Sequence, residues 1–122
     1  MDYRQLVRAL AYGRIAVGTS LVVAPGRAGR TWIGEAGRLP EVKVIARAFG
    51  VRDLAFGVGT LEALRGDAPA RSWVALGMVS DLVDLAATTL ALRSLGARRA
   101  LPVMAVAATA ATVGYLARDQ VD

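Results

Sequence analysis

The stretch Val42–Leu64, VKVIARAFGVRDLAFGVGTLEAL, is long enough to cross a bilayer as a helix, yet it carries Arg52 and Asp53 at its midpoint. A charged side chain at that depth costs about 2.5–3.5 kcal/mol on insertion scales, so it normally faces partners or water inside a bundle. We therefore predict that other segments of the chain supply partners for these two charges.

The composition of the 122-residue chain is too apolar for an ordinary soluble domain. Hydrophobic residues make up 55% of it and the mean hydropathy is +0.44. Four apolar segments occur, at about residues 6–24, 42–64, 73–92 and 100–117. We expect one all-α integral domain over residues 1–122, a four-helix transmembrane bundle that is a multi-pass protein of the cell membrane.

The residue types that the chain lacks restrict its chemistry. With no Cys and no His, disulfides, thiol nucleophiles, imidazole bases and nearly all zinc or haem sites are excluded, and we expect no metal and no cofactor. The net charge is +5, with the basic excess at the edges of the apolar segments, as expected beside lipid headgroups. The lipid bilayer is the expected partner. Nucleic acid is not, because no aromatic platform accompanies the arginines.

The first span, 6–24, contains a single charge, Arg14. At ~1.5 Å per residue it covers about 28 Å, close to the thickness of the hydrocarbon layer. A cleavable signal peptide is the competing interpretation, but Arg14 divides the apolar run and Pro25 makes a poor cleavage context. Residues 25–41 contain two prolines and four glycines, so we expect a loop there.

Small residues and aspartates share helix faces in the second and third spans. The face in 42–64 consists of Ala46, Gly50, Asp53, Gly57 and Thr60. The face in 73–92 consists of Gly77, Asp81, Asp84 and Thr88. Small residues let another helix approach closely in a membrane, so the carboxylates on these faces are expected to point at neighbouring helices rather than at lipid.

The basic residues at the ends of the spans and in the connections between them are distributed unevenly over the two sides of the membrane. Four spans place five of them on the side of the termini: Arg4, Arg8, Arg65, Arg71 and Arg118. They place seven on the other side: Arg27, Arg30, Arg38, Lys43, Arg93, Arg98 and Arg99. By the positive-inside rule, this distribution favours both termini outside the cytoplasm.

Two short motifs carry a resemblance to a family. The run ARAFGVRDLAFG at 46–57 and the run SDLVD at 80–84 fit a pattern AR-x-FG-x-RD-x-x-x-G followed by D-x-x-D. This pattern resembles that of small four-helix integral membrane proteins of actinobacteria and fungi, which are grouped as a domain of unknown function. The resemblance implies a four-helix membrane fold and no known activity.

We expect ionisable side chains from three spans to meet at mid-depth. The candidates are Arg14, Arg47, Arg52, Asp53, Asp81 and Asp84. In one interpretation the arginines neutralise the aspartates and only fix the packing. In the other, incompletely paired groups bind or pass a small polar or ionic ligand. Because the three aspartates lie at one depth, they form a site more readily than a path.

Sharper chemistry is left open by the sequence. Asp81 and Asp84 are candidates for a general acid and base acting on a lipidic metabolite, in an isomerisation or cyclisation, with Arg52 stabilising an anion. The same D-x-x-D could hold Mg²⁺ and a diphosphate, but the second acidic motif expected of such enzymes is absent. The arginines also suit the binding of an anion.

The leading hypothesis is a non-enzymatic membrane protein that binds or passes a small polar or ionic ligand. A membrane-embedded enzyme and a structural or assembly subunit are the alternatives. A homo-oligomer is compatible with all three hypotheses, because four short helices leave little room for a cavity within one protomer and Ala/Gly faces can pack between protomers.

Overall fold

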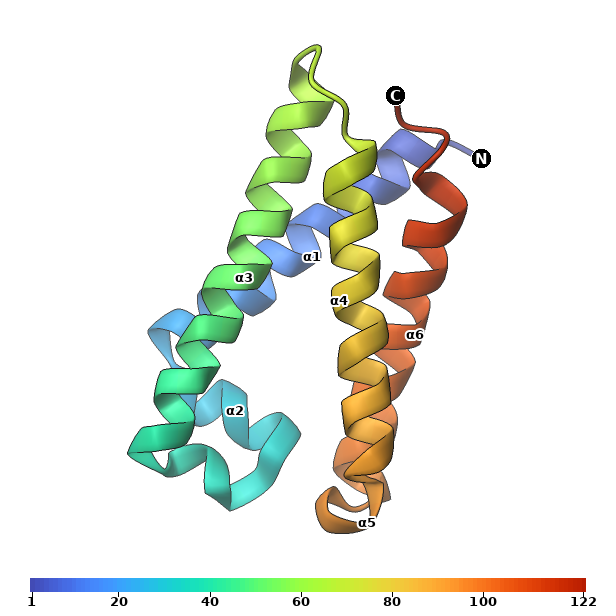
Figure 1. The fold of residues 1–122 in the computed structure, drawn as a ribbon. Helices are drawn as coiled ribbons and strands as arrows, with labels where there is room; N and C mark the ends of the chain where they lie inside the picture. The colour runs from blue at the N-terminus through green and yellow to red at the C-terminus, as the bar shows by residue number, and fades with distance from the viewer.

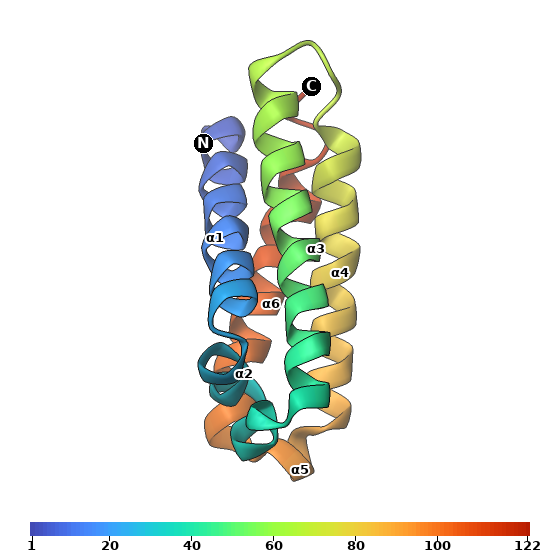
Figure 2. The same ribbon diagram turned by 90° about the vertical axis from the view of Figure 1, so that its left-hand side faces the viewer.

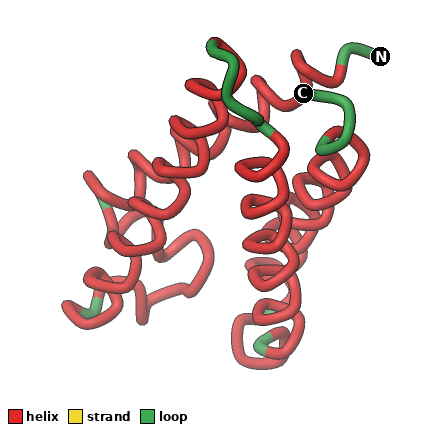
Figure 3. The backbone as a smooth tube through the Cα atoms, turned by 45° about the horizontal axis from the view of Figure 1, so that its top comes forward, coloured by secondary structure: helices red, strands yellow, loops and turns green.

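The computed structural model describes residues Met1–Asp122, which are almost entirely helical and include no strand. The elements are α1 (Tyr3–Val23), α2 (Pro25–Ile33), the 3₁₀-helix η1 (Gly34–Arg38), α3 (Pro40–Arg65), α4 (Arg71–Leu90), α5 (Leu92–Leu95) and α6 (Ala97–Ala117). Figure 3 shows how little of the backbone lies outside them. The predicted all-α class is confirmed, and the boundaries of the four long helices lie within three residues of the predicted segments.

Three helices, α1, α4 and α6, are long and apolar enough to cross a membrane. The remaining long helix, α3, has 26 residues and covers the predicted span 42–64, but it is not among the three. Seven of its residues are charged, which lowers its apolar character. Length and composition therefore support a membrane protein with three spans.

The long helices form two pairs, in which α1 lies along α3 and α4 lies along α6 (Figure 2). The pairs approach each other at the end that holds both termini, and α3 and α4 diverge toward the opposite end (Figure 1). At that end α2 packs against α1, α3 and α6, and its Trp32 reaches α3 and α4. The indole Nε1 donates a hydrogen bond to Thr88 Oγ1 on α4 at 3.2 Å, and the ring meets Phe49 of α3 edge to face.

Residues 25–41 are helical, so the expectation of a loop was wrong. Pro25 occupies the first turn of α2 and Pro40 that of α3, where a missing N–H is tolerated. Gly34 ends α2 with φ of +82°, a left-handed conformation that favours glycine. Proline and glycine thus mark the ends of short helices here instead of preventing them.

The interior combines small and apolar residues with several polar side chains, and many large apolar residues lie on the outer surface. The buried polar side chains are Arg14, Asp53, Thr60, Ser80, Asp81 and Thr88. Large apolar residues point outward, and Val44, Val83 and Val106 each expose more than half of their surface. This is the reverse of a water-soluble bundle and suits helices that face lipid.

The end of the bundle that holds the termini is closed by apolar packing and by caps. Its cluster consists of Val7, Ala63, Leu64, Ala70, Val74, Ala117 and Val121. Arg4 donates hydrogen bonds to the carbonyl oxygens of Leu64 and Val121. The carboxylate of Asp122 accepts from the N–H groups of Ala70 and Arg71, so it caps the start of α4.

Candidate functional site: an arginine and aspartate network

Glycines on α1 and α3 bring the first two members of the network together. A Cβ atom added to Gly18 would lie 2.5 Å from the carbonyl oxygen of Gly50, and one added to Gly50 would lie 2.6 Å from that of Gly18. Gly57 approaches a carbonyl oxygen of α1 in the same way, at 2.7 Å. The two backbones therefore touch, and Arg14 and Asp53, each within one turn of these contacts, face each other.

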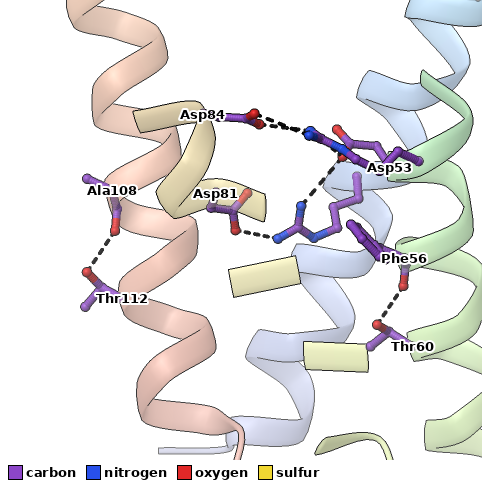
Figure 4. A network of polar contacts seen from close by, with 9 residues as sticks. Asp53, Phe56, Thr60, Asp81, Asp84, Ala108 and Thr112 are labelled. Carbon is purple, nitrogen blue, oxygen red and sulfur yellow. Dashed lines mark hydrogen bonds and ion pairs between the residues drawn. The ribbon is translucent and has the colours of Figure 1, made fainter. Parts of the chain in front are cut away.

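Both arginines of the network reach from the α1–α3 pair to carboxylates on α4. Arg14 donates a hydrogen bond from Nη2 to Asp81 Oδ2, and its Nη1 lies 3.8 Å from Asp53 Oδ1. Arg52 holds both oxygens of Asp84, at 3.3 and 2.9 Å, and also donates to Asp53 Oδ1 at 3.3 Å. Figure 4 shows Asp81 and Asp84 turned toward Asp53 across the space between the pairs.

Neighbouring residues fix the two guanidinium groups. A Cβ atom on Gly77 would lie 2.8 Å from Arg14 Nη2, so the absence of a side chain there provides the space that Arg14 occupies. The guanidinium carbon of Arg52 lies 4.1 Å from the centroid of the Phe49 ring, within range of a cation–π interaction. Each arginine is thus positioned by packing as well as by charge.

The network is nearly enclosed, and its formal charge is −1 when every member is ionised, since two arginines face three aspartates. The side chains of Arg14 and Asp81 each expose 9%, whereas that of Arg52 exposes 26%. Arg52 Nε is buried without a hydrogen-bond partner. The pairing is therefore extensive but incomplete.

Five of the six residues singled out in the sequence meet in this network, and Arg47 does not. Arg47 is exposed and donates from Nε to the carbonyl oxygen of Val22 at 3.2 Å. That carbonyl belongs to the last turn of α1, whose oxygens have no partner within the helix. Arg47 therefore caps the end of α1 instead of joining the arginine and aspartate network.

The geometry narrows the chemistry that was left open. Asp81 and Asp84 are held by different arginines, so they do not form a free pair of carboxyl groups for acid and base catalysis. No three acidic side chains converge in a way that would hold a metal ion. The guanidinium groups face carboxylates, which leaves the excess negative charge as the distinctive property of the site.

Sequence reasoning did not find an apolar cavity beside the network. Its volume is about 230 Å³, and α1 to α5 contribute to its lining, which includes Trp32, Phe49 and Thr88. Phe49 lines the cavity and also stacks on Arg52, so the cavity ends next to the network. The sequence feature that could have indicated the cavity is Thr88, which shares a helix face with Asp81 and Asp84 and lines the cavity.

Comparison with known protein families, with curated proteins and with solved structures finds no match for this chain. The function of the site must therefore be argued from its geometry. The sequence resemblance to a family of four-helix membrane proteins stays a prediction.

Proposed function

We propose that the chain is a four-span membrane protein whose arginine and aspartate network takes up a small cation, in the first instance a proton, near the middle of the bilayer. Treating α3 as the fourth span is supported by its backbone contact with α1, which carries it alongside a helix that is long and apolar enough to span. Arg52 and Asp53 face inward, whereas Val44, Val51 and Val58 face outward.

The observation that carries the proposal is the imbalance of charge. Three carboxylates face two guanidinium groups, and α6 adds no charged side chain between Arg99 and Arg118. An uncompensated charge in a medium of low dielectric constant is strongly disfavoured. A proton or a monovalent cation would neutralise the network and keep one carboxylate partner for each arginine.

Asp53 is the carboxylate that suits this role. Asp81 and Asp84 each have an arginine of their own, bound by a direct hydrogen bond. Asp53 shares both arginines, at 3.8 Å from Arg14 and 3.3 Å from Arg52. Loss of its negative charge therefore leaves two complete pairs, Arg14 with Asp81 and Arg52 with Asp84.

The surroundings of the network support uptake from the end of the bundle that holds α2. Arg52, the most exposed member, stacks on Phe49, and Phe49 lines the apolar cavity between α2, α3 and α4. The opposite end is closed by the apolar cluster around Val7 and Val121. With access from one end, binding is better supported than passage.

The proposal is tested by following protonated carboxyl groups in protein reconstituted into vesicles, using infrared difference spectra recorded over a pH series. We expect a band of a buried protonated carboxyl group in the wild type and its loss in Asp53→Asn. Glu62→Gln, which removes an exposed acid from the same helix, is the matched control and should keep the band. Identical spectra for the wild type and Asp53→Asn would contradict the proposal.

A structural role is the second candidate, because the same ion pairs connect the α1–α3 pair to α4. In that case the network only holds the two pairs together. Asp53→Asn would then change the stability of the bundle, and no protonated carboxyl band would be present in the wild type. Proton flux into vesicles loaded with a pH-sensitive dye separates binding from passage, since binding alone gives no sustained flux.

A further inference from the structure

A second cavity lies at the end of the bundle that holds α2, and polar residues line it throughout. Its volume is about 420 Å³. The lining residues come from α2, η1 and the start of α6: Arg27, Arg30, Thr31, Gly34, Glu35 and Arg99. Three guanidinium groups and one carboxylate therefore surround the space, which makes it strongly positive.

Two of the three arginines are free to bind a ligand. Glu35 is engaged by Arg30 at 2.9 Å and by Arg38 at 3.5 Å, so its charge is already paired. The side chains of Arg27 and Arg99 make no ion pair and no hydrogen bond within the chain. Each guanidinium offers five N–H donors in a planar fork that suits phosphate oxygens.

The position of Arg99 depends on a glycine. Gly34 has φ of +82°, and a Cβ atom there would lie 3.0 Å from the guanidinium carbon of Arg99. A side chain at position 34 would be strained and would also displace the guanidinium. The junction of α2 and η1 is therefore shaped to receive a cation from α6, although no carboxylate of the chain pairs with it.

The charge of this end suits an anionic lipid surface. The segments that meet here contain seven basic residues, Arg27, Arg30, Arg38, Lys43, Arg93, Arg98 and Arg99, and two acidic ones, Glu35 and Glu41. The opposite end holds five basic residues and five acidic ones, so it has no excess. Anionic lipids of the cytoplasmic leaflet attract basic segments of this kind.

Apolar surface lies directly beside the polar cavity. Ile33, the neighbour of Gly34, exposes 40% of its surface and lines the apolar cavity together with Gly29 and Trp32 of the same helix. One side of α2 thus presents arginines and the other presents apolar residues. A ligand that matches both sides carries an anionic group and a hydrocarbon chain.

We infer that this end of the molecule binds the headgroup of an anionic phospholipid, with the phosphate between Arg27 and Arg99 and an acyl chain against Ile33. The inference rests on the membrane placement that is part of the proposed function, but not on cation uptake by the network. The chemistry that Arg27 and Arg99 recognise is a phosphate, which a lipid or free inorganic phosphate could supply, and the apolar surface at Ile33 favours the lipid.

The test uses purified full-length protein in a zwitterionic detergent, titrated with phosphatidylglycerol, with phosphatidylcholine or with inorganic phosphate. Native mass spectrometry counts the retained lipids at each lipid concentration. Arg27→Gln/Arg99→Gln removes the two free guanidinium groups. Arg93→Gln/Arg98→Gln is the matched control, because it removes the same charge from the same end at exposed residues outside the cavity.

We expect the wild type to prefer phosphatidylglycerol, and the cavity variant to bind it more weakly than the control variant by a factor of at least about ten, since the loss of even one charge-assisted hydrogen bond has an effect of that size. Equal weakening in both variants would overturn the inference in favour of general surface charge. Inorganic phosphate that binds as well as the lipid would overturn the assignment to a lipid, as would equal affinity for phosphatidylcholine. Asp53→Asn should bind phosphatidylglycerol like the wild type. Failure of cation uptake by the network can therefore be distinguished from failure of lipid binding.

Discussion

The contact between α1 and α3 and the contact between the two helix pairs are built in different ways. The first is a close backbone approach at Gly18 and Gly50, around which the side chains of Leu54 and Val22 pack. The second depends at mid-depth on long side chains, with Arg14 and Arg52 extending to carboxylates on α4. A backbone contact has one geometry, whereas a contact through ion pairs responds to the charge of its members. The bundle thus combines a fixed interface with one that depends on charge.

The largest effect is expected when the charge-dependent interface loses an arginine. Arg14→Met leaves Asp81 buried without its cation and Asp53 with Arg52 alone, and removal of one partner from a buried pair costs about 3–5 kcal/mol. The measurement is the free energy of unfolding in mixed micelles. Arg14→Met/Asp81→Leu should recover much of the loss, since it removes both charges of the pair. If the double variant is no more stable than the single one, the arginine acts through packing and the comparison fails.

A smaller effect is expected at the fixed interface. Gly18→Ala places a methyl group 2.5 Å from the carbonyl oxygen of Gly50, and overpacking of this kind costs about 1–3 kcal/mol. Gly13→Ala is the control on the same helix, because nothing lies within 4 Å of its added carbon. That variant should unfold at the same or a slightly higher denaturant concentration, as alanine favours a helix over glycine. Equal destabilisation of both variants would show that α1 and α3 are not held in backbone contact.

The smallest effect is expected where an ion pair lies outside both interfaces. Glu62 and Arg65 pair at 3.2 Å on α3, and both side chains expose 67%. Glu62→Gln should lower the free energy of unfolding by less than about 1 kcal/mol, as for exposed pairs in general. A loss as large as that of Arg14→Met would mean that burial does not distinguish the two classes of ion pair. The same unfolding assay in mixed micelles compares the two variants.

Helical periodicity accounts for what could be predicted of the site. A helix places Gly50, Asp53 and Gly57 on one face whatever surrounds it, so the small-residue face and its aspartate could be read from spacing alone. Gly77 was expected to permit close approach of a helix, but the space it leaves is filled by the guanidinium of Arg14. Whether a backbone or a long side chain fills the space beside a glycine depends on the residues of the neighbouring helix. The spacing of residues within one helix cannot predict this.

Arg47 and residues 25–41 could not be predicted correctly for the same reason, because their structure depends on contacts between segments. The hydrogen-bond partner of Arg47 depends on where α1 ends, because the carbonyl of Val22 is free to accept only if it lies in the last turn of that helix. The glycines and prolines of 25–41 fit a loop or short helices equally well. Tertiary contacts determine that short helices form, such as the hydrogen bond from Trp32 to Thr88 and the packing of Gly29 on Gly37.

The cap on α4 has a consequence for how the protein is made. The N–H groups at the start of that helix donate hydrogen bonds to Asp122, which is synthesised 52 residues after Ala70. The α1–α3 pair needs nothing beyond residue 65 to form its glycine contacts, so it can assemble while the ribosome is still adding α4 to α6. The start of α4, in contrast, stays without this cap until residue 122 has been added. Capping of α4 is therefore a late step in the synthesis of the chain.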